Sequence, residues 1–438
     1  MKKVTLSLVL TLCLLAMAIV PAFAEVTIDD MPKVDLTDKV VSMYFWGDSY
    51  ENYGKEGLEP WQQHTFEKVY GGQLKVVQSS GDYYENLYAL MTAGDCPDVI
   101  LAHDNTFPSF IMNGIAQPAE DFIYTDNAIW SEIRDLEDMK QMEINGHIYC
   151  VTTAFHGMGV LFYNERILEE AGLDMPVELW KNGEWTWDKF SEYMIDLTQD
   201  TDRDGLTDIY GMAYASDFYH CWFGTTGVDM IGFVDGKFVN LLKDERITAA
   251  ADFLYNHGPM GEDVFLEGDP TDLLVNGKVA MGFTNDWRLY YDLAELEATD
   301  GLGVVPLPQS PFMETCVNST IPDYWYILKD AKNPVGAGLF LLCNRYDDVV
   351  NVDPSKEKLD ARETYIQSVM KDGSGCSRED AEVLYIINRE LPSVLLTSRY
   401  ISIDRSELLS TPWTTIADSI YEATNQKIID ALTPAVAE

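Results

Sequence analysis

The sequence predicts an α/β protein with two lobes, and three observations support this fold class. Strand-like and helix-like segments alternate along the chain, as they do in a mostly parallel sheet covered by helices. About 414 of the 438 residues follow a leader segment, which exceeds the roughly 250–300 residues that one hydrophobic core usually holds. Hydrophobic residues make up 47% of the chain, so packed cores can form.

Residues 1–24 have the pattern of a secretory signal peptide. Two lysines precede an apolar run, and the Ala-Phe-Ala sequence at 22–24 is a small-x-small cleavage site. The run is too short for a spanning helix, and Pro21 ends it. Cys13 lies inside the run, so we expect no lipobox cysteine and no lipid anchor. We therefore expect an exported protein, either periplasmic or extracellular and associated with the cell surface.

The charge balance restricts the class of partner. Removal of two leader lysines and no acid changes the formal charge from −42 to −44. This excess of acid repels phosphate backbones and anionic lipids, so we expect no nucleic acid or membrane surface as partner. A neutral or cationic ligand is favoured. The cysteines after the leader form no CxxC pair and are predicted to be free: Cys96, Cys150, Cys221, Cys316, Cys343 and Cys376.

The first half of the chain predicts three strands and two helices in alternation. Each strand is a β-rich run, each helix has apolar residues at helical spacing, and glycines end both helices. The expected strands are 39–47, 73–80 and 98–102, and the expected helices are 56–71 and 82–94.

The pattern restarts after residue 146. Two β-rich runs flank 155–157 (Phe-His-Gly), which we expect to cross from one lobe to the other. The remaining segments continue the alternation and end in several C-terminal helices. We expect helices at 165–172, 186–200 and 245–258, strands at 210–215 and 301–308, and a helix, turn and strand across 270–286. The segments 324–330 and 333–346 follow them.

Polar residues follow the predicted strand at 98–102. His103, Asp104 and Asn105 come directly after its apolar residues. Ligands of open α/β sheets lie beyond the carboxyl ends of the strands, where loops are free to carry function. This position suggests a binding role for Asp104.

Several segments together resemble the extracellular solute-binding proteins of sugar-importing ABC transporters, a family that includes maltose-binding protein. They are, in order, YYENLYALMTAGDCPDVILAHDNTF, GVLFYNERILEEAGLDMP, GEWTWDKF, NGKVAMGFTNDW, GVVPLPQSP and LKDAKNPVGAGLFLL. The resemblance implies a two-lobed type II periplasmic-binding-protein-like fold, with a hinge and a ligand cleft between the lobes. It implies lobe 1 at 25–154 plus 318–389 and lobe 2 at 155–317 plus 390–438. It also implies a monomeric receptor that delivers a sugar or oligosaccharide to a membrane permease.

The resemblance also implies that individual residues of this sequence belong to a ligand site. The acid of Ala102-His103-Asp104 matches one that binds sugar hydroxyls, whereas Asn105 and Leu101 depart from the maltose-binding pattern. The departures put maltose itself in doubt. The remaining matched positions are Asp48, Glu85, Asp217, Tyr219, Trp222, Trp287 and Trp413.

A sugar site needs two kinds of surface. Flat aromatic rings contact the C–H face of a pyranose, and carboxylates or amides accept hydrogen bonds from its hydroxyl rim. Trp46, Trp325 and Asp286 extend the predicted site on this chemistry. Each tryptophan could instead be a core residue, since large aromatic side chains are usually buried. We interpret Trp130, Trp180, Trp185 and Trp187 as packing residues.

The segment DTDRDGLTD resembles the start of a calcium loop. Asp200, Asp202 and Asp204 alternate, the Leu206 carbonyl and Asp208 follow, and Gly205 allows a sharp turn. Position twelve is glycine where an EF-hand has glutamate, so the hand is incomplete. The alternatives are a structural Ca²⁺ and a solvated acidic turn. We expect no other cofactor.

Catalytic functions have less support. The chain has no GxSxG, HExxH, GxxxxGK[ST] or strand-following GxGxxG motif. A secreted carbohydrate-active enzyme with paired carboxylates, such as Asp104 and Asp286, stays open because spatial proximity is invisible in a sequence. A binding protein that serves a sensor is a third possibility.

Overall fold

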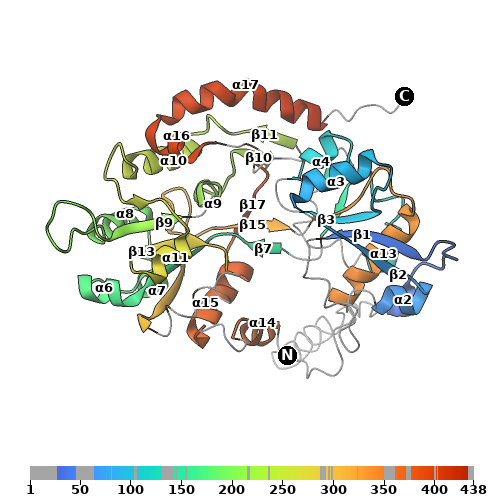
Figure 1. Cartoon of the computed structure of the whole chain (residues 1–438), viewed down its shortest axis with the longest axis horizontal. Coiled ribbons are helices and arrows are strands. Elements are labelled where there is room, and N and C mark those ends of the chain that lie inside the picture. The colour runs from blue at the N-terminus through green and yellow to red at the C-terminus, as the bar shows by residue number, and fades with distance from the viewer. Residues whose placement is uncertain are drawn as a thin grey trace, which may run out of the picture.

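The computed structural model describes most of the chain and is shown in Figure 1. The described residues are 27–45, 64–79, 81–102, 106–130, 143–144, 146–152, 155–214, 218–234, 237–286, 293, 296, 299–322, 324–349, 361–370, 376–398, 401 and 403–432. The predicted signal peptide lies outside them. Within them, no helix combines the length and apolar character that crossing a bilayer requires.

Lobe 1 is built on a five-stranded sheet with the order β2-β1-β3-β16-β6. The first three strands run parallel. β16 is antiparallel to β3 on one side and to β6 on the other. All four residues of β3 are buried, as expected for a central strand covered on both faces. The elements are η1 (Ile28–Asp30), β1 (Val40–Phe45), α2 (His64–Tyr70), β2 (Gln73–Gln78), α3 (Tyr83–Thr92), β3 (Val99–Ala102), α4 (Ser109–Met112), β4 (Glu143–Ile144), β5 (His147–Ile148), β6 (Cys150–Val151), β16 (Tyr324–Ile327) and α13 (Pro334–Val349).

Lobe 2 contains a second five-stranded sheet, with the order β12-β9-β13-β8-β14. Strands β12, β9 and β13 are parallel, and β8 is antiparallel to both of its neighbours. Its elements before the return to lobe 1 are β8 (Val160–Asn164), α6 (Glu165–Ala171), α7 (Pro176–Lys181), α8 (Trp187–Asp196), β9 (Tyr210–Tyr214), α9 (Phe218–Gly224), β10 (Ile231–Val234), β11 (Lys237–Asn240), α10 (Glu245–His257), β12 (Phe265–Leu266), α11 (Pro270–Val275), β13 (Val279–Thr284) and β14 (Leu302–Pro306).

Local sequence signals account for several helix ends in lobe 2. The Asn164 side chain accepts from the Ile167 amide and caps α6, which ends at Gly172 with φ 71°. Thr186 caps α8 through its hydroxyl, as its position in the sequence predicts.

A sheet of three short strands lies between the two lobes, and two of these strands carry the chain from one lobe to the other. β7 (Phe155–Gly157), β15 (Asn318–Pro322) and β17 (Ser393–Leu395) form one sheet with the order β17-β15-β7 between the larger sheets (Figure 1). The crossing predicted at 155–157 is therefore a strand of the connecting sheet. Asn318 fixes the lobe 2 end, because its side chain accepts from the Gly159 amide and donates to the Ile387 carbonyl.

The last helices pack mainly on lobe 2. α14 (Ala361–Val369) and α15 (Arg378–Arg389) share a buried cluster with β14, which includes Val304, Ile366 and Leu384. The sequence interpretation placed these helices in lobe 1, and their apolar faces instead cover the lobe 2 sheet. α16 (Arg405–Ser410) and α17 (Trp413–Leu432) pack on α10, and α17 also reaches α4 of lobe 1.

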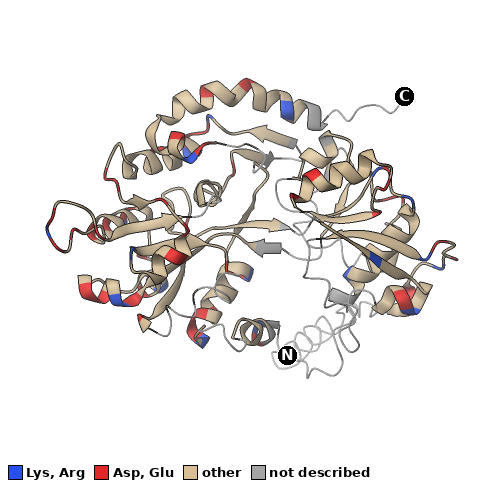
Figure 2. Ribbon diagram, viewed as in Figure 1, with Lys and Arg blue, Asp and Glu red and all other residues tan. Residues whose placement is uncertain are grey.

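Charged side chains lie mainly on the outer helices and loops. Figure 2 shows acidic residues distributed over both lobes rather than gathered in one patch. None of the six cysteines that follow the leader forms a disulfide in the structure.

Candidate ligand-binding site

The sheet topology brings the predicted ligand loops to two strand edges. β1 and β3 are parallel, so both end at the same edge of the lobe 1 sheet. β9 and β13 are parallel and end together in lobe 2. The loops after these four strands carry Trp46, Asp48, Asp104, Asn105, Asp217 and Trp287, which all lie outside the described residues. Their role in binding stays a prediction, supported by the usual place of ligands at strand carboxyl ends.

Trp222 lies in the core of lobe 2. Its side chain is 0% exposed, and its ring stacks on Trp187 with centroids 4.7 Å apart. The indole nitrogen donates to the Ala250 carbonyl at 2.9 Å. Both the ring face and the N–H group are therefore used within the protein, which is the core alternative that the sequence left open.

Trp325 and Trp413 are also buried. Trp325 is 4% exposed in β16, where it pairs with Leu101 of β3. Trp413 is 2% exposed, and its indole nitrogen donates to the Leu242 carbonyl at 2.9 Å. Neither ring offers an open platform in this structure. The four tryptophans interpreted as packing residues are buried or partly buried: Trp130, Trp180, Trp185 and Trp187.

Three other predicted residues lie near strand or helix ends. Glu85 is exposed in the first turn of α3. Tyr219 is 7% exposed in α9, directly after the loop that follows β9. Asp286 follows β13 and is half-buried, and its carboxylate accepts from Asn388 Nδ2 at 2.9 Å. This hydrogen bond links Asp286, at the end of β13, to α15.

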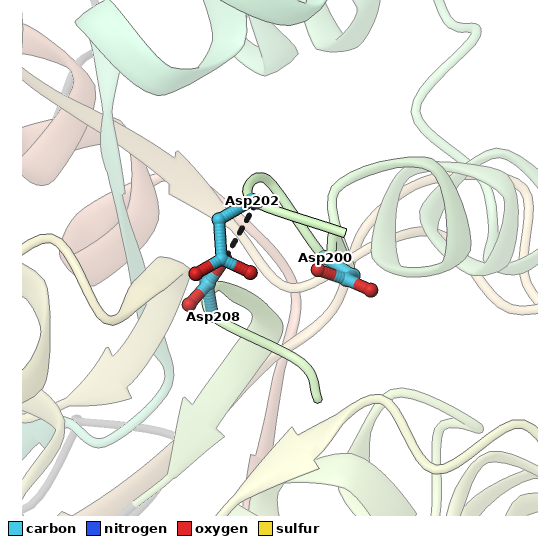
Figure 3. Close-up of side chains that lie close together, drawn as sticks. All are labelled: Asp200, Asp202 and Asp208. Carbon is cyan, nitrogen blue, oxygen red and sulfur yellow. Dashed lines mark hydrogen bonds between the residues drawn. The ribbon is translucent and has the colours of Figure 1, made fainter. Parts of the chain in front are cut away.

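The acidic loop of lobe 2 gathers three carboxylates. One oxygen from each of Asp200, Asp202 and Asp208 lies within 4.8 Å of the others (Figure 3). Oxygen ligands of this kind suit Ca²⁺. The same carboxylates accept hydrogen bonds from the loop itself, such as Gly205 N to Asp200 and Thr201 N to Asp208. The pKa of Asp208 is lowered chiefly by its hydrogen bond from the Thr201 side chain.

The rest of the calcium-loop pattern is less complete. Asp204 accepts from the Leu206 amide at 2.8 Å and does not join the cluster of three. The twelfth position, Gly211, is a residue of β9, and a Cβ there would lie 2.2 Å from the Met194 carbonyl oxygen. Backbone packing therefore excludes the usual glutamate. The Ca²⁺ site stays a prediction.

A buried acid that the sequence interpretation missed lies beside the connecting strands. Asp229 is 1% exposed and accepts from the Thr397 and Ser398 amides, both at 2.8 Å, just after β17. Ser398 Oγ also donates to it, and His220 Nδ1 lies 3.2 Å from that hydroxyl. Burial raises the pKa of Asp229 to about 6 and lowers that of His220 to about 3. The Thr397 and Ser398 partners are more than 160 residues away, so no local pattern marks this acid.

Two of the cavities among the described residues of lobe 2 border α7 and α16, respectively. One of ≈ 640 Å³ lies between α7 and α15, and its wall includes the ion pair from Lys181 Nζ to Glu379 at 2.6 Å. The other, of ≈ 240 Å³, lies at the carboxyl ends of β9 and β12 beneath α16 and includes Tyr214 and Arg405. Only the second adjoins a strand end that the sequence marks for ligand binding.

Comparison with known proteins assigns the family. Residues 47–341 match the family model described as bacterial extracellular solute-binding protein. The chain belongs to this family. The match spans both large sheets and the strands β7 and β15, and the family's extracellular character agrees with the predicted export.

Solved structures support the same fold. The chain is similar to the GacH receptor of Streptomyces glaucescens, studied with acarbose, at 15% identity and TM-score 0.57 over 89% of this chain and 98% of that one. It is also similar to a Streptococcus pneumoniae solute-binding protein in complex with the blood group A-trisaccharide, at 18% identity and TM-score 0.54 over 90% of this chain and 98% of that one. The maltose/maltodextrin-binding domain MalE of Bdellovibrio bacteriovorus, bound to maltotriose, is similar at 16% identity and TM-score 0.54 over 90% of this chain and 98% of that one.

Proposed function

We propose that this protein is a carbohydrate receptor that captures a neutral sugar or oligosaccharide between its lobes and delivers it to an ABC importer. The observation that carries the proposal is that each large sheet ends two parallel strands at one edge, β1 and β3 in one sheet and β9 and β13 in the other. The sequence after these four strand ends contains the acids and aromatic residues that sugar recognition needs. The similar receptors bind saccharides of several kinds, which favours this ligand class over amino acids or metal ions.

The geometry also supports a closing mechanism. The crossing strands β7 and β15 are short, and the connecting sheet lies between the two larger sheets. A few residues in such strands can absorb the backbone rotation by which two lobes close around a ligand. We propose that the permease recognises the closed form.

Substitution at the predicted loops tests the site. Asp104→Ala and Trp287→Ala are each expected to weaken saccharide binding about tenfold, or about 1.4 kcal/mol, because each removes a direct ligand contact. Titration calorimetry measures the affinity, and an unchanged Tm shows that the fold is intact. Unchanged affinity in both variants would place the site elsewhere.

The same samples separate a receptor from an enzyme. A receptor raises its Tm on saccharide addition and leaves the sugar intact, whereas the enzyme alternative with Asp104 and Asp286 shortens it. Chromatography of the incubated saccharide shows whether it has stayed intact or has been shortened. We propose the receptor alone, as a monomer exported without a lipid anchor.

A further inference from the structure

The side chain of Asn388 lies between the acid at the end of β13 and the connecting sheet. Asn388 belongs to the last turn of α15 and is half-buried. Its Nδ2 donates to Asp286 Oδ2 at 2.9 Å and to the Tyr365 hydroxyl of α14 at 2.8 Å. Both N–H groups of the amide are therefore used, and one of them is used on a residue that the sequence predicts as a ligand contact.

The acid sets the orientation of this amide. An ionised carboxylate only accepts hydrogen bonds, so the amide must turn its nitrogen toward Asp286. The amide oxygen, Asn388 Oδ1, is buried and has no hydrogen-bond partner within the part of the chain that the structure describes. An unpaired buried oxygen costs free energy. The opposite orientation would cost more, because it would place Oδ1 against the carboxylate.

The unpaired oxygen lies against Gly157 in the crossing strand β7. A Cβ at this position would lie 1.8 Å from Asn388 Oδ1 and 2.6 Å from Asn318 Nδ2, so only glycine allows this approach. The same turn of α15 holds the crossing strand β15, because the Ile387 carbonyl accepts from Asn318 Nδ2 at 3.0 Å. The end of α15 therefore contacts β7, β15 and the end of β13 (Figure 1).

These contacts place Asp286 close to the connection between the lobes. One side chain, Asn388, touches the acid on one side and β7 on the other. An acceptor in this position is suited to a ligand that lies between two lobes joined by β7 and β15. An acceptor held in one orientation before binding also loses less side-chain entropy when the ligand arrives.

We propose that Asn388 is a positioning residue of the ligand site. It orients the Asp286 carboxylate to accept a hydrogen bond from a ligand hydroxyl, and it does not itself contact the ligand. This inference rests on the proposed function and deepens it, because it adds a residue of α15 to the determinants of saccharide affinity.

A double-mutant cycle tests whether Asn388 acts through Asp286. Asn388→Ala removes the amide and should lower saccharide affinity about fivefold, and Asp286→Ala removes the acceptor and should lower it about tenfold. In the Asp286→Ala background, Asn388→Ala should change the affinity by less than about twofold, because no carboxylate is left to orient. Calorimetric titration of the full exported chain with maltotriose, acarbose and the blood group A-trisaccharide measures these affinities.

Asn240 of β11 provides a matched control. It is also half-buried, and its Nδ2 donates to the Tyr421 carbonyl at 3.1 Å and to Asn425 Oδ1 at 2.8 Å. β11 and α15 lie on opposite sides of the connecting sheet in Figure 1. Asn240→Ala should therefore lower Tm about as much as Asn388→Ala does and leave every affinity within about twofold. A loss of affinity in both variants that follows the loss of Tm would show a merely structural role for Asn388.

The remaining outcomes separate this inference from the proposed function. Unchanged affinity in Asn388→Ala, unchanged affinity in Asp286→Ala, or losses that add in the double variant overturn the positioning role and leave the receptor intact. A wild type that binds none of the three saccharides overturns the proposed function, and the positioning role with it.

Discussion

Two carboxylates of lobe 2, one in the acidic loop and one buried beside the connecting strands, accept similar hydrogen bonds in different surroundings. Asp208 and Asp229 both accept hydrogen bonds from backbone amides and from a hydroxyl group. The pKa of Asp208 is lowered and that of Asp229 is raised to about 6. Hydrogen bonds dominate at the solvated loop. The loss of water dominates at the buried site, although the Met230 amide adds a fourth donor to those of Thr397 and Ser398. The number of hydrogen bonds alone therefore does not set the protonation of an acid.

The two acids also differ in what they hold together. Asp208 joins residues within a span of eight, and its donors belong to its own turn. Asp229 joins the end of the connecting strand β17 to the segment that precedes β10. The first stabilises a surface loop, and the second fixes the end of one strand of the connecting sheet.

The largest expected effect comes from removing the buried acid. Asp229→Ala leaves the Thr397 and Ser398 amides without an acceptor in the core, which should lower the free energy of unfolding by about 3 kcal/mol. Asp208→Ala should have a much smaller effect, because water replaces the lost acceptor. Scanning calorimetry of the two variants measures the difference. Equal losses of Tm would contradict the comparison.

The pH dependence of stability sharpens the comparison. The folded pKa of Asp229 is raised, so its favourable contribution is present below pH 3.8 and is lost as the pH rises through about 6. The folded pKa of His220 is lowered, so its contribution is present above pH 6.5 and is lost as the pH falls toward 3. Between pH 4 and 6 the two contributions oppose each other.

Single variants separate these contributions. In Asp229→Asn, stability should fall with decreasing pH in this window, by up to about 1.4 kcal/mol per pH unit. In His220→Gln, stability should fall with increasing pH instead. Tm measured from pH 4 to 7 gives both slopes, and slopes that match the wild type would show that neither group titrates as described.

A smaller effect is expected from calcium at the exposed loop. Ca²⁺ would replace the backbone amides as partner of Asp200, Asp202 and Asp208, so it should raise Tm, and a chelator should lower it. Asp200→Ala should abolish the shift, whereas Glu262→Gln, at an exposed site outside the loop, should preserve it. The absence of any shift in the wild type would leave a solvated acidic turn.

Much of the fold was predictable from local patterns. The alternation of strands and helices, the cap at Thr186 and the crossing at 155–157 depend on neighbouring residues, and the structure contains all three. The buried positions of Trp222 and Trp413 were not predictable, because a tryptophan beside a strand end has the same local pattern in a core and in a binding site. Six of the twelve predicted ligand residues lie outside the described residues, so their role in binding stays a prediction.

The sequence by itself determined the acidic charge, the α/β alternation and the family resemblance, because each depends on composition or on short stretches, and it predicts the export signal on the same basis. Only the tertiary structure decided that α14 and α15 cover the lobe 2 sheet, that Asp229 holds the end of β17, and that Asn388 lies between Asp286 and β7. These contacts join residues far apart in the chain. Their free energy comes from burial and hydrogen bonds that exist only after the chain has folded.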